Sequence, residues 1–226
     1  MQKAVQHLRN NLRPNFPNHY RKAFVVLGII SFFLFVGFTF LVRSDALRSF
    51  DFNSTVRIQD DIPVRFDGFF TILSVIGRFE FSLVILTIIL FLKRKLTGIA
   101  ALFLFGTSHI IEIVGKSILS QPGPPNMFLR TTDLSLNFPG LYVHTDASYP
   151  SGHSLRVLFL SIIVVFIIWH IKKLPAFLKK LIIGSVLFYA FLMLLSRVSL
   201  GEHWMTDVIG GTLLGLSFGL FSLLFL

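Results

Sequence analysis

The chain has 226 residues, of which 54% are hydrophobic, and its mean hydropathy is +0.75. A soluble domain of this length does not carry so much apolar surface, so the composition excludes an ordinary water-soluble fold. The sequence contains no cysteine, which excludes disulfides and thiolate metal sites. The net charge of +10 would suit a nucleic-acid partner, but the positions of the charges along the chain indicate a different cause.

Several apolar segments approach the roughly 20 residues that a helix needs to cross the core of a bilayer. They are continuously apolar rather than alternating, which disfavours a β-barrel. The sequence therefore predicts an all-α, polytopic membrane protein with six transmembrane helices. A basic segment, 1–22, precedes the first span, 23–42. This span is too long for the apolar region of a signal peptide and lacks a small-residue cleavage site, so we expect a retained helix.

The second span is interrupted by charges. Residues 69–92 are apolar except for Arg78 and Glu80. We expect an interfacial helix over 69–76 and a membrane-crossing part over 77–92.

The later spans are separated by connections of very different length. We expect the spans at 96–119, 154–171, 181–195 and 207–226. The connection 120–151 is rich in Pro, Gly, Asn and Asp, and a structureless loop of this length is usually functional or disordered. No internal repeat divides the chain, so residues 23–226 are expected to form one membrane domain.

The charges divide between the two ends of the spans. With six spans, the segment 1–22 and the turns at 93–95 and 172–180 share one side, and they hold twelve of the 21 Lys and Arg but none of the eleven Asp and Glu. By the positive-inside rule this side is cytoplasmic, together with both termini. Contact with anionic lipid then explains the net charge, and we expect no nucleic-acid partner. The outer loops lie at about 43–76, 120–153 and 196–206.

Pro150-Ser151-Gly152-His153 stands directly before the fourth span. Pro and Ser are favourable at a helix start, and Gly lets a ligand approach the backbone closely. The backbone N–H groups and the dipole at a helix N-terminus attract anions, and a His there can donate a proton to a leaving oxygen. The segment predicts an anion site with its own acid. A polar loop that merely caps the helix is the alternative.

A second group, Ser196-Arg197, five residues, His203, three residues and Asp207, lies at the same predicted surface. His203 and Asp207 are spaced i, i+4 and would share one face of a helix. A carboxylate bonded to one imidazole nitrogen fixes the tautomer and frees the other nitrogen as a nucleophile or base. The planar guanidinium of Arg197 matches phosphate. Interfacial snorkelling of Arg197 and a local His–Asp bond are the alternative.

Lys116 ends the third span at this surface, where a Lys is often only an interfacial anchor. Glu112, one helical turn earlier, is a candidate partner for it, and His109 is expected to be a buried polar contact. No cluster in the sequence has convincing metal-ligand spacing, so we expect no metal and no cofactor.

The order Lys116, Pro-Ser-Gly-His and Ser-Arg-x5-His-x3-Asp resembles the tripartite signature of the type 2 phosphatidic acid phosphatase superfamily of membrane lipid phosphatases. The resemblance covers about residues 116–207, and six spans also suit the family. It implies that His203 attacks phosphorus and forms a phosphohistidine. Asp207 would orient His203. His153 would protonate the leaving group and then act as base for the incoming water.

The resemblance also implies how the phosphate is held. Its oxygens would be bound by Lys116, Arg197, Ser151 and the backbone of Gly152. In the family's first motif the Lys is followed by six residues, Arg and Pro, whereas here Gly123 and Pro124 stand at those positions. Two arginines could replace the missing one. We prefer Arg156, because an Arg one turn into a span is costly in lipid and should face the site. The other is Arg130, for which a solvated loop charge is the alternative.

Gly211, Gly215 and Gly219 form a stripe on the sixth span. Small residues at this spacing permit close helix packing, within the chain or between copies.

The resemblance leads us to expect a metal-independent hydrolase that acts on a lipid phosphate or diphosphate at the outer leaflet of a bacterial plasma membrane. Candidate substrates are undecaprenyl diphosphate, phosphatidylglycerol phosphate and phosphatidic acid. We favour the first, because recycling of a lipid carrier fits the small size and the outward site. A lipid phosphotransferase with the same site and a non-catalytic lipid-binding or transport protein are the alternatives. The sequence leaves the oligomeric state open.

Overall fold

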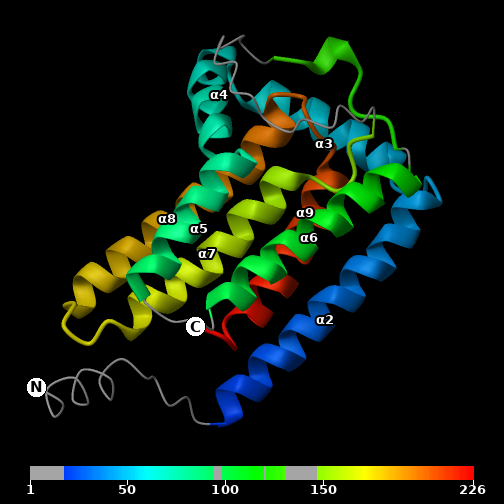
Figure 1. The fold of residues 1–226 in the computed structure, drawn as a ribbon. Helices are drawn as coiled ribbons and strands as arrows, with labels where there is room; N and C mark the ends of the chain where they lie inside the picture. Colours follow the sequence, from blue (N-terminus) through cyan, green and yellow to red (C-terminus); the bar gives the residue numbers. More distant parts are fainter. Residues whose placement is uncertain (1–17, 94–97, 120, 131–146) are drawn as a thin grey trace, which may run out of the picture.

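Helices make up most of the structure, a computed structural model that describes residues 18–93, 98–119, 121–130 and 147–226 (Figure 1). The α-helices are α2 (Asn18–Arg43), α3 (Arg48–Asp61), α4 (Asp67–Ile76), α5 (Phe79–Lys93), α6 (Gly98–Leu119), α7 (Gly152–His170), α8 (Ala176–Ser199) and α9 (Met205–Ser222). Two short 3-10 helices, η1 (Val64–Phe66) and η2 (Asn126–Phe128), lie between them. The expected all-α class is confirmed.

Five of the described helices, α2, α6, α7, α8 and α9, are long and apolar enough to cross a membrane. The segments Val64–Ile76 and Phe79–Phe91 together pass the same test, but they are bent by 52° at their junction. The described part of the chain thus contains five candidate spans, or six if the bent pair is one span. The break falls at the expected boundary, because Gly77 and Arg78 separate α4 from α5.

The ends of α7 and α8 differ from the expected ones. Helix α7 begins at Gly152, so His153 lies in its first turn rather than before it. Helix α8 extends beyond 181–195 at both ends, and its last turn includes Ser196 and Arg197. Both of these polar side chains are fully buried, so the helix continues in protein after its apolar run has ended.

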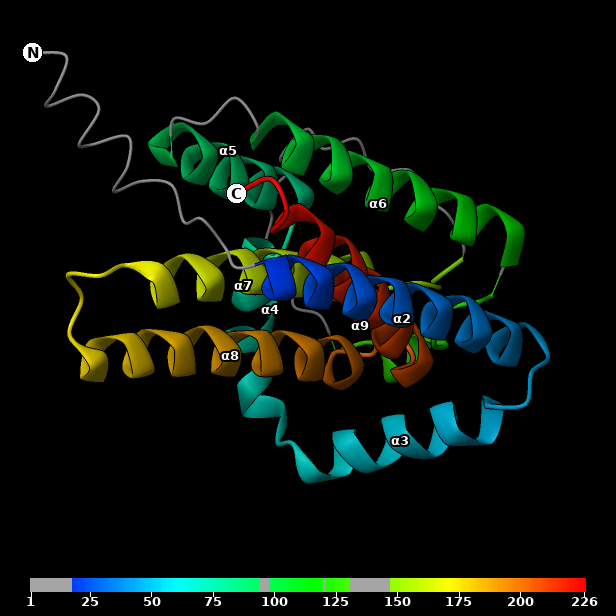
Figure 2. The ribbon, with the colours of Figure 1, turned by 90° about the horizontal axis from the view of Figure 1, so that it is seen from below.

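Helix α7 lies inside the bundle, with α8 on one side and α5 and α6 on the other (Figure 2). Helix α9 packs against α7 through the glycine stripe. A Cβ on Gly211 would lie 2.2 Å from the carbonyl oxygen of Ser151, and one on Gly215 would lie 2.4 Å from that of Leu155. The stripe therefore serves packing within the chain, where it brings the two backbones together.

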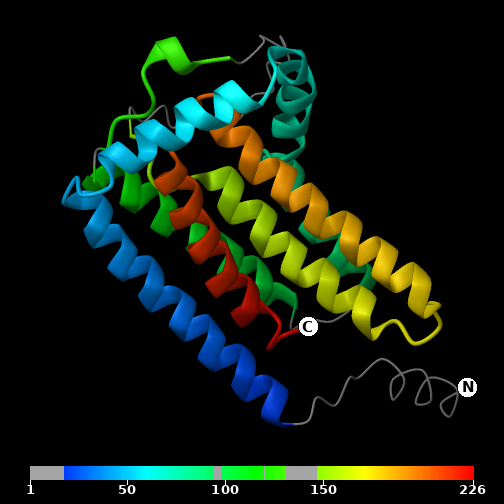
Figure 3. The same cartoon turned by 180° about the vertical axis from the view of Figure 1, so that it is seen from behind.

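Helix α3 lies across one end of the bundle (Figures 1 and 3). The outer loop expected at about 43–76 thus contains this helix, whose inward face is polar: Asp51, Thr55 and Gln59 are buried. The Asp51 carboxylate accepts hydrogen bonds from the backbone N–H (2.8 Å) and hydroxyl (2.7 Å) of Thr206. Burial raises the pKa of Asp51, although the bonds to Thr206 oppose this shift. A helix that docks through polar groups has no apolar stripe, so the hydrophobic pattern did not indicate it.

The other end of the bundle holds the first described turn of α2 and the C-terminus (Figure 1). The α8–α9 turn, which carries His203, lies at the end covered by α3. The described termini and the turn with His203 are therefore at opposite ends of the bundle.

Candidate active site

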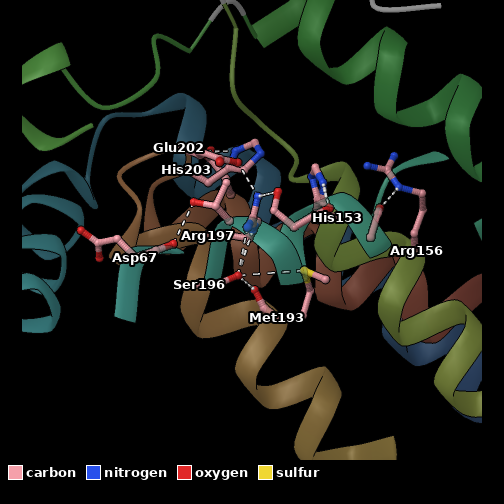
Figure 4. Close-up of polar contacts among 12 residues, drawn as sticks. Asp67, His153, Arg156, Met193, Ser196, Arg197, Glu202 and His203 are labelled. Carbon is pink, nitrogen blue, oxygen red and sulfur yellow. Dashed lines mark hydrogen bonds and ion pairs between the residues drawn. The ribbon is translucent and has the colours of Figure 1, made fainter. Parts of the chain in front are cut away.

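Polar side chains from three helix ends come together at the end of the bundle that α3 covers. His153 comes from the first turn of α7, Arg197 from the last turn of α8, and His203 from the turn that precedes α9. Figure 4 shows these three side chains in one group. The break between α4 and α5 borders the same group: Ser74 contacts His153 and Arg197, and the Gly77 carbonyl accepts from Arg156.

Arg197 is fully buried, and all three guanidinium nitrogens have partners. The Nη1 donates to the Ser74 hydroxyl at 2.8 Å and forms an ion pair with the Glu202 carboxylate. The Nε and Nη2 donate to the Ser196 hydroxyl at 3.2 and 3.0 Å. A buried guanidinium is stable only with such partners. The snorkelling alternative for Arg197 is therefore wrong, since the side chain points into the protein.

His203 and Asp207 meet at the start of α9. The fully buried Asp207 accepts a hydrogen bond from the backbone N–H of Trp204 at 2.8 Å, and the same Oδ2 lies 3.4 Å from His203 Nδ1. Because α9 begins at Met205, the pair meets across the helix cap, and the expectation that it shares a helical face is wrong. The carboxylate faces Nδ1, so Nε2 is the nitrogen left for other chemistry. Among the described residues Nδ1 has no hydrogen-bond partner, and contacts of this kind often tighten into hydrogen bonds only when a substrate binds.

His153 is placed by the same segment that holds Arg197. Its Nε2 lies 3.2 Å from the carbonyl oxygen of Ser74, whose hydroxyl accepts from Arg197. A carbonyl accepts only from a protonated nitrogen, so this contact favours a proton on Nε2. Gly77 provides the space: a Cβ there would lie 2.9 Å from the His153 ring.

Glu112 is the centre of a buried charged group between α6 and α7. Its Oε1 accepts from Lys116 Nζ at 2.9 Å, and its Oε2 lies 2.8 Å from His109 Nδ1 and 3.7 Å from Arg156 Nη1. The expected Glu112–Lys116 contact and the buried polar role of His109 are both present. Arg156 is 8% exposed and donates from Nε to the Gly77 carbonyl at 2.9 Å, so it faces the protein interior rather than lipid.

Ser151 immediately precedes α7 and Gly152 is its first residue. The two residues lie beside Asp207 and the charged group around Glu112. The Ser151 backbone N–H donates to the Asp207 carbonyl at 2.9 Å, and its hydroxyl is buried without a hydrogen-bond partner among the described residues. A buried hydroxyl of this kind is a candidate donor to a ligand oxygen. A Cβ on Gly152 would lie 2.2 Å from Glu112 Oε1 and 2.7 Å from Arg156 Nη1. Glycine therefore lets the charged group around Glu112 pack against the start of α7.

Arg130 has other partners. Its Nη1 donates to the Ile62 carbonyl at 3.2 Å, and its backbone N–H donates to that of Leu200 at 2.9 Å. The side chain is half-buried. Arg130 thus ties its loop to the connection between α3 and α4, and it is not a freely solvated charge.

Two residues with direct contacts to the group were missed by the sequence analysis, Ser74 and Glu202. Ser74 is an ordinary helical residue with no local signal. Glu202 stands immediately before His203, so its charge was visible in the sequence although its pairing with Arg197 was not. Within the described ranges, no three His, Cys, Asp or Glu side chains are placed to share a metal ion.

Two proteins with similar sequences are lipid phosphatases by name. The family model described as the PAP2 superfamily matches residues 96–226. The chain is 31% identical over 147 residues to phosphatidylglycerophosphatase B of Bacillus subtilis, covering 62% of this chain and 66% of that protein. It is 32% identical over 150 residues to undecaprenyl-diphosphatase of Sulfolobus acidocaldarius, covering 66% and 65%. The matched regions span just under two thirds of each relative.

Two solved structures share the arrangement of helices. The transmembrane PAP2 type phosphatidylglycerolphosphate phosphatase from Bacillus subtilis superposes with a TM-score of 0.69 at 25% identity, covering 88% of this chain and 94% of that one. Aquifex aeolicus LpxE superposes with a TM-score of 0.56 at 24% identity, covering 77% and 94%. The second likeness concerns the fold alone.

Proposed function

Since this chain belongs to the PAP2 superfamily, we propose that it is an enzyme that hydrolyses a lipid phosphate or diphosphate through a phosphohistidine on His203. The observation that carries the proposal is the convergence of His153, Arg197 and His203 at one end of the bundle (Figure 4). The named activities of the relatives support a lipid phosphate as the substrate class.

In the first half of the proposed reaction, His203 Nε2 attacks phosphorus and the bond to the leaving oxygen breaks. His153, protonated on both ring nitrogens, gives one proton to that oxygen and is left neutral. Asp207, 3.4 Å from His203 Nδ1, stabilises the positive charge that develops on the ring. In the second half, His153 takes a proton from water, the water oxygen attacks the phosphohistidine, and inorganic phosphate leaves with His203 restored.

Binding and neutralisation of the phosphate would fall to Arg197, Lys116, Ser151 and the backbone N–H of Gly152. Phosphoryl transfer needs mainly alignment and neutralisation of the equatorial oxygens. Cationic side chains can supply this neutralisation, so we propose that the activity is independent of divalent metal.

We propose that Arg156 replaces the arginine missing at Gly123. Its buried guanidinium shares Glu112 with Lys116 and contacts Gly77, which borders the His153 ring. Arg156→Ala should lower kcat/KM by about tenfold to a hundredfold, because one of the phosphate cations is lost. Arg130→Ala is the matched control and should change kcat/KM less than threefold or so, since Arg130 contacts Ile62. The measurement is kcat/KM of both variants with a soluble short-chain lipid phosphate. A larger loss of kcat/KM in Arg130→Ala would show that Arg130 is the replacement for the missing arginine.

We propose that the site faces the outside of a bacterial plasma membrane and that both termini are cytoplasmic. The twelve basic residues of 1–22, 93–95 and 172–180 support this orientation through the positive-inside rule. The described termini lie at the end of the bundle opposite His203, in agreement with it (Figure 1).

The proposed function is tested by measuring phosphate release from undecaprenyl diphosphate, phosphatidylglycerol phosphate and phosphatidic acid in detergent. We expect release from at least one substrate, with undecaprenyl diphosphate favoured. We also expect the rate to change by less than about twofold with EDTA, because arginine and lysine bear the neutralisation. Strong loss with EDTA and recovery with magnesium would contradict metal independence. Failure on all three substrates would favour a phosphotransferase or a lipid-binding protein.

A further inference from the structure

The guanidinium of Arg197 forms an ion pair with a carboxylate of the protein itself. Glu202 Oε2 accepts from Arg197 Nη1 (Figure 4). The side chain of Arg197 is 0% exposed, whereas that of Glu202 is 24% exposed. Glu202 thus lies on the solvent side of the arginine that we assign to phosphate.

The backbone fixes Glu202 beside the proposed nucleophile. The backbone N–H groups of Glu202 and His203 both donate to the carbonyl oxygen of Arg197 at 3.1 Å. The turn depends on Gly201, which has a φ of +68° and whose Cβ would lie 2.1 Å from the Phe128 carbonyl oxygen. The backbone therefore holds Glu202 close to Arg197. The carboxylate can leave the guanidinium by rotation of its own partly exposed side chain.

Two further partners of Arg197 are neutral hydroxyls. The hydroxyls of Ser74 and Ser196 accept from the guanidinium from within the protein, and Ser196 is fully buried. Carboxylate and phosphate oxygens are both anionic acceptors that match a guanidinium donor. A phosphate that approaches Arg197 from solvent would meet Glu202 first, and two anions in contact repel each other.

We propose that Glu202 is an internal anion that fills the phosphate position on Arg197 in the empty enzyme and is displaced when the substrate binds. This inference rests on the proposed function. Glu202 then weakens the binding of every phosphate ligand, because each ligand must break an existing ion pair before it forms a new one. It would also keep the buried charge of Arg197 compensated between turnovers.

The inference is tested with Glu202→Gln and inorganic phosphate as the probe. Isothermal titration calorimetry in detergent should show phosphate binding about tenfold more tightly to Glu202→Gln than to the wild type, because a competing charge is gone. In a phosphate-release assay the KM should fall by a larger factor than kcat changes. Asp60→Asn removes one negative charge from the exposed side of α3 and is the matched control, for which phosphate affinity should stay at the wild-type value.

Glu202→Ala separates two causes of tighter binding. A glutamine could itself donate to phosphate, whereas an alanine cannot, so tighter binding by both variants supports displacement of the carboxylate. Unchanged or weaker phosphate binding in both folded variants would overturn the inference and make Glu202 a residue that positions Arg197. If that result came with phosphate release from lipids, the hydrolase proposal would still stand. If both variants bound phosphate more tightly but no lipid were hydrolysed, the hydrolase proposal alone would fail.

Discussion

Replacing His203 with alanine is expected to lower phosphate release from lipid by about a thousandfold or more, because the attacking nitrogen is removed. The thermal unfolding midpoint should change little. The ring is not fully buried, and the hydrogen bonds that shape its turn come from backbone groups that alanine retains. The measurements are the initial rate on the preferred lipid of the substrate panel and the unfolding midpoint in the same detergent.

His170→Ala is the matched control for this experiment. His170 is the last residue of α7, at the end of the bundle opposite His203, and its Nδ1 lies 2.7 Å from the carbonyl oxygen of Phe166. The rate should stay within about twofold of the wild type, because this ring lies away from the proposed site. Transfer of labelled phosphate from substrate to protein should be seen with the wild type and lost with His203→Ala. Labelling that persists in His203→Ala would mean that another residue is the nucleophile.

Asp207→Asn is expected to lower kcat by roughly a thousandfold to ten-thousandfold, as expected when a carboxylate that orients a catalytic histidine is neutralised. The amide oxygen of asparagine can still accept from the Trp204 N–H, so the start of α9 should remain capped. The substitution thus removes the negative charge beside His203 Nδ1 while it keeps the structural bond. Steady-state kcat and the unfolding midpoint are the two measurements.

Asp60→Asn makes the same chemical change on the exposed side of α3 and should leave both quantities near their wild-type values. A loss of only a few fold in Asp207→Asn, with an unchanged midpoint, would contradict the proposed role. It would show that the backbone of the α8–α9 turn orients His203 without help from the charge.

The spans could be predicted because a bilayer imposes a length and an apolar composition on any helix that crosses it. The same reasoning located the bend at Gly77 and Arg78, since charges interrupt the apolar run there. The grouping of His153, Arg197 and His203 could be predicted because alternation of the spans brings the ends of their segments to one end of the bundle. These predictions depend on local composition and on the rule that successive spans run in opposite directions.

The missed features depend on contacts between residues far apart in the chain. Ser74 and Arg197 are 123 positions apart, and Gln59 in α3 donates to the Ser199 carbonyl 140 positions away. Neither bond leaves a periodic pattern in the sequence. The pairing of His203 with Asp207 was predicted on a helical face because the spacing fits one, but α9 begins two residues after His203. Spacing identified the partners, and the start of the helix determined their geometry.

Helices α3 and α4 limit which segments can be exchanged between this protein and a relative. The stretch that matches the family model starts at residue 96, yet Asp51, Ser74 and Gly77 from earlier in the chain form hydrogen bonds at the end that carries the two histidines. Part of the scaffold around the histidines thus comes from sequence outside the matched stretch. A chimera that transplants the signature alone would carry His153, Arg197 and His203 but would lack the contacts from Asp51, Ser74 and Gly77. The exchangeable unit of this protein is the whole bundle together with the helix that lies across its end.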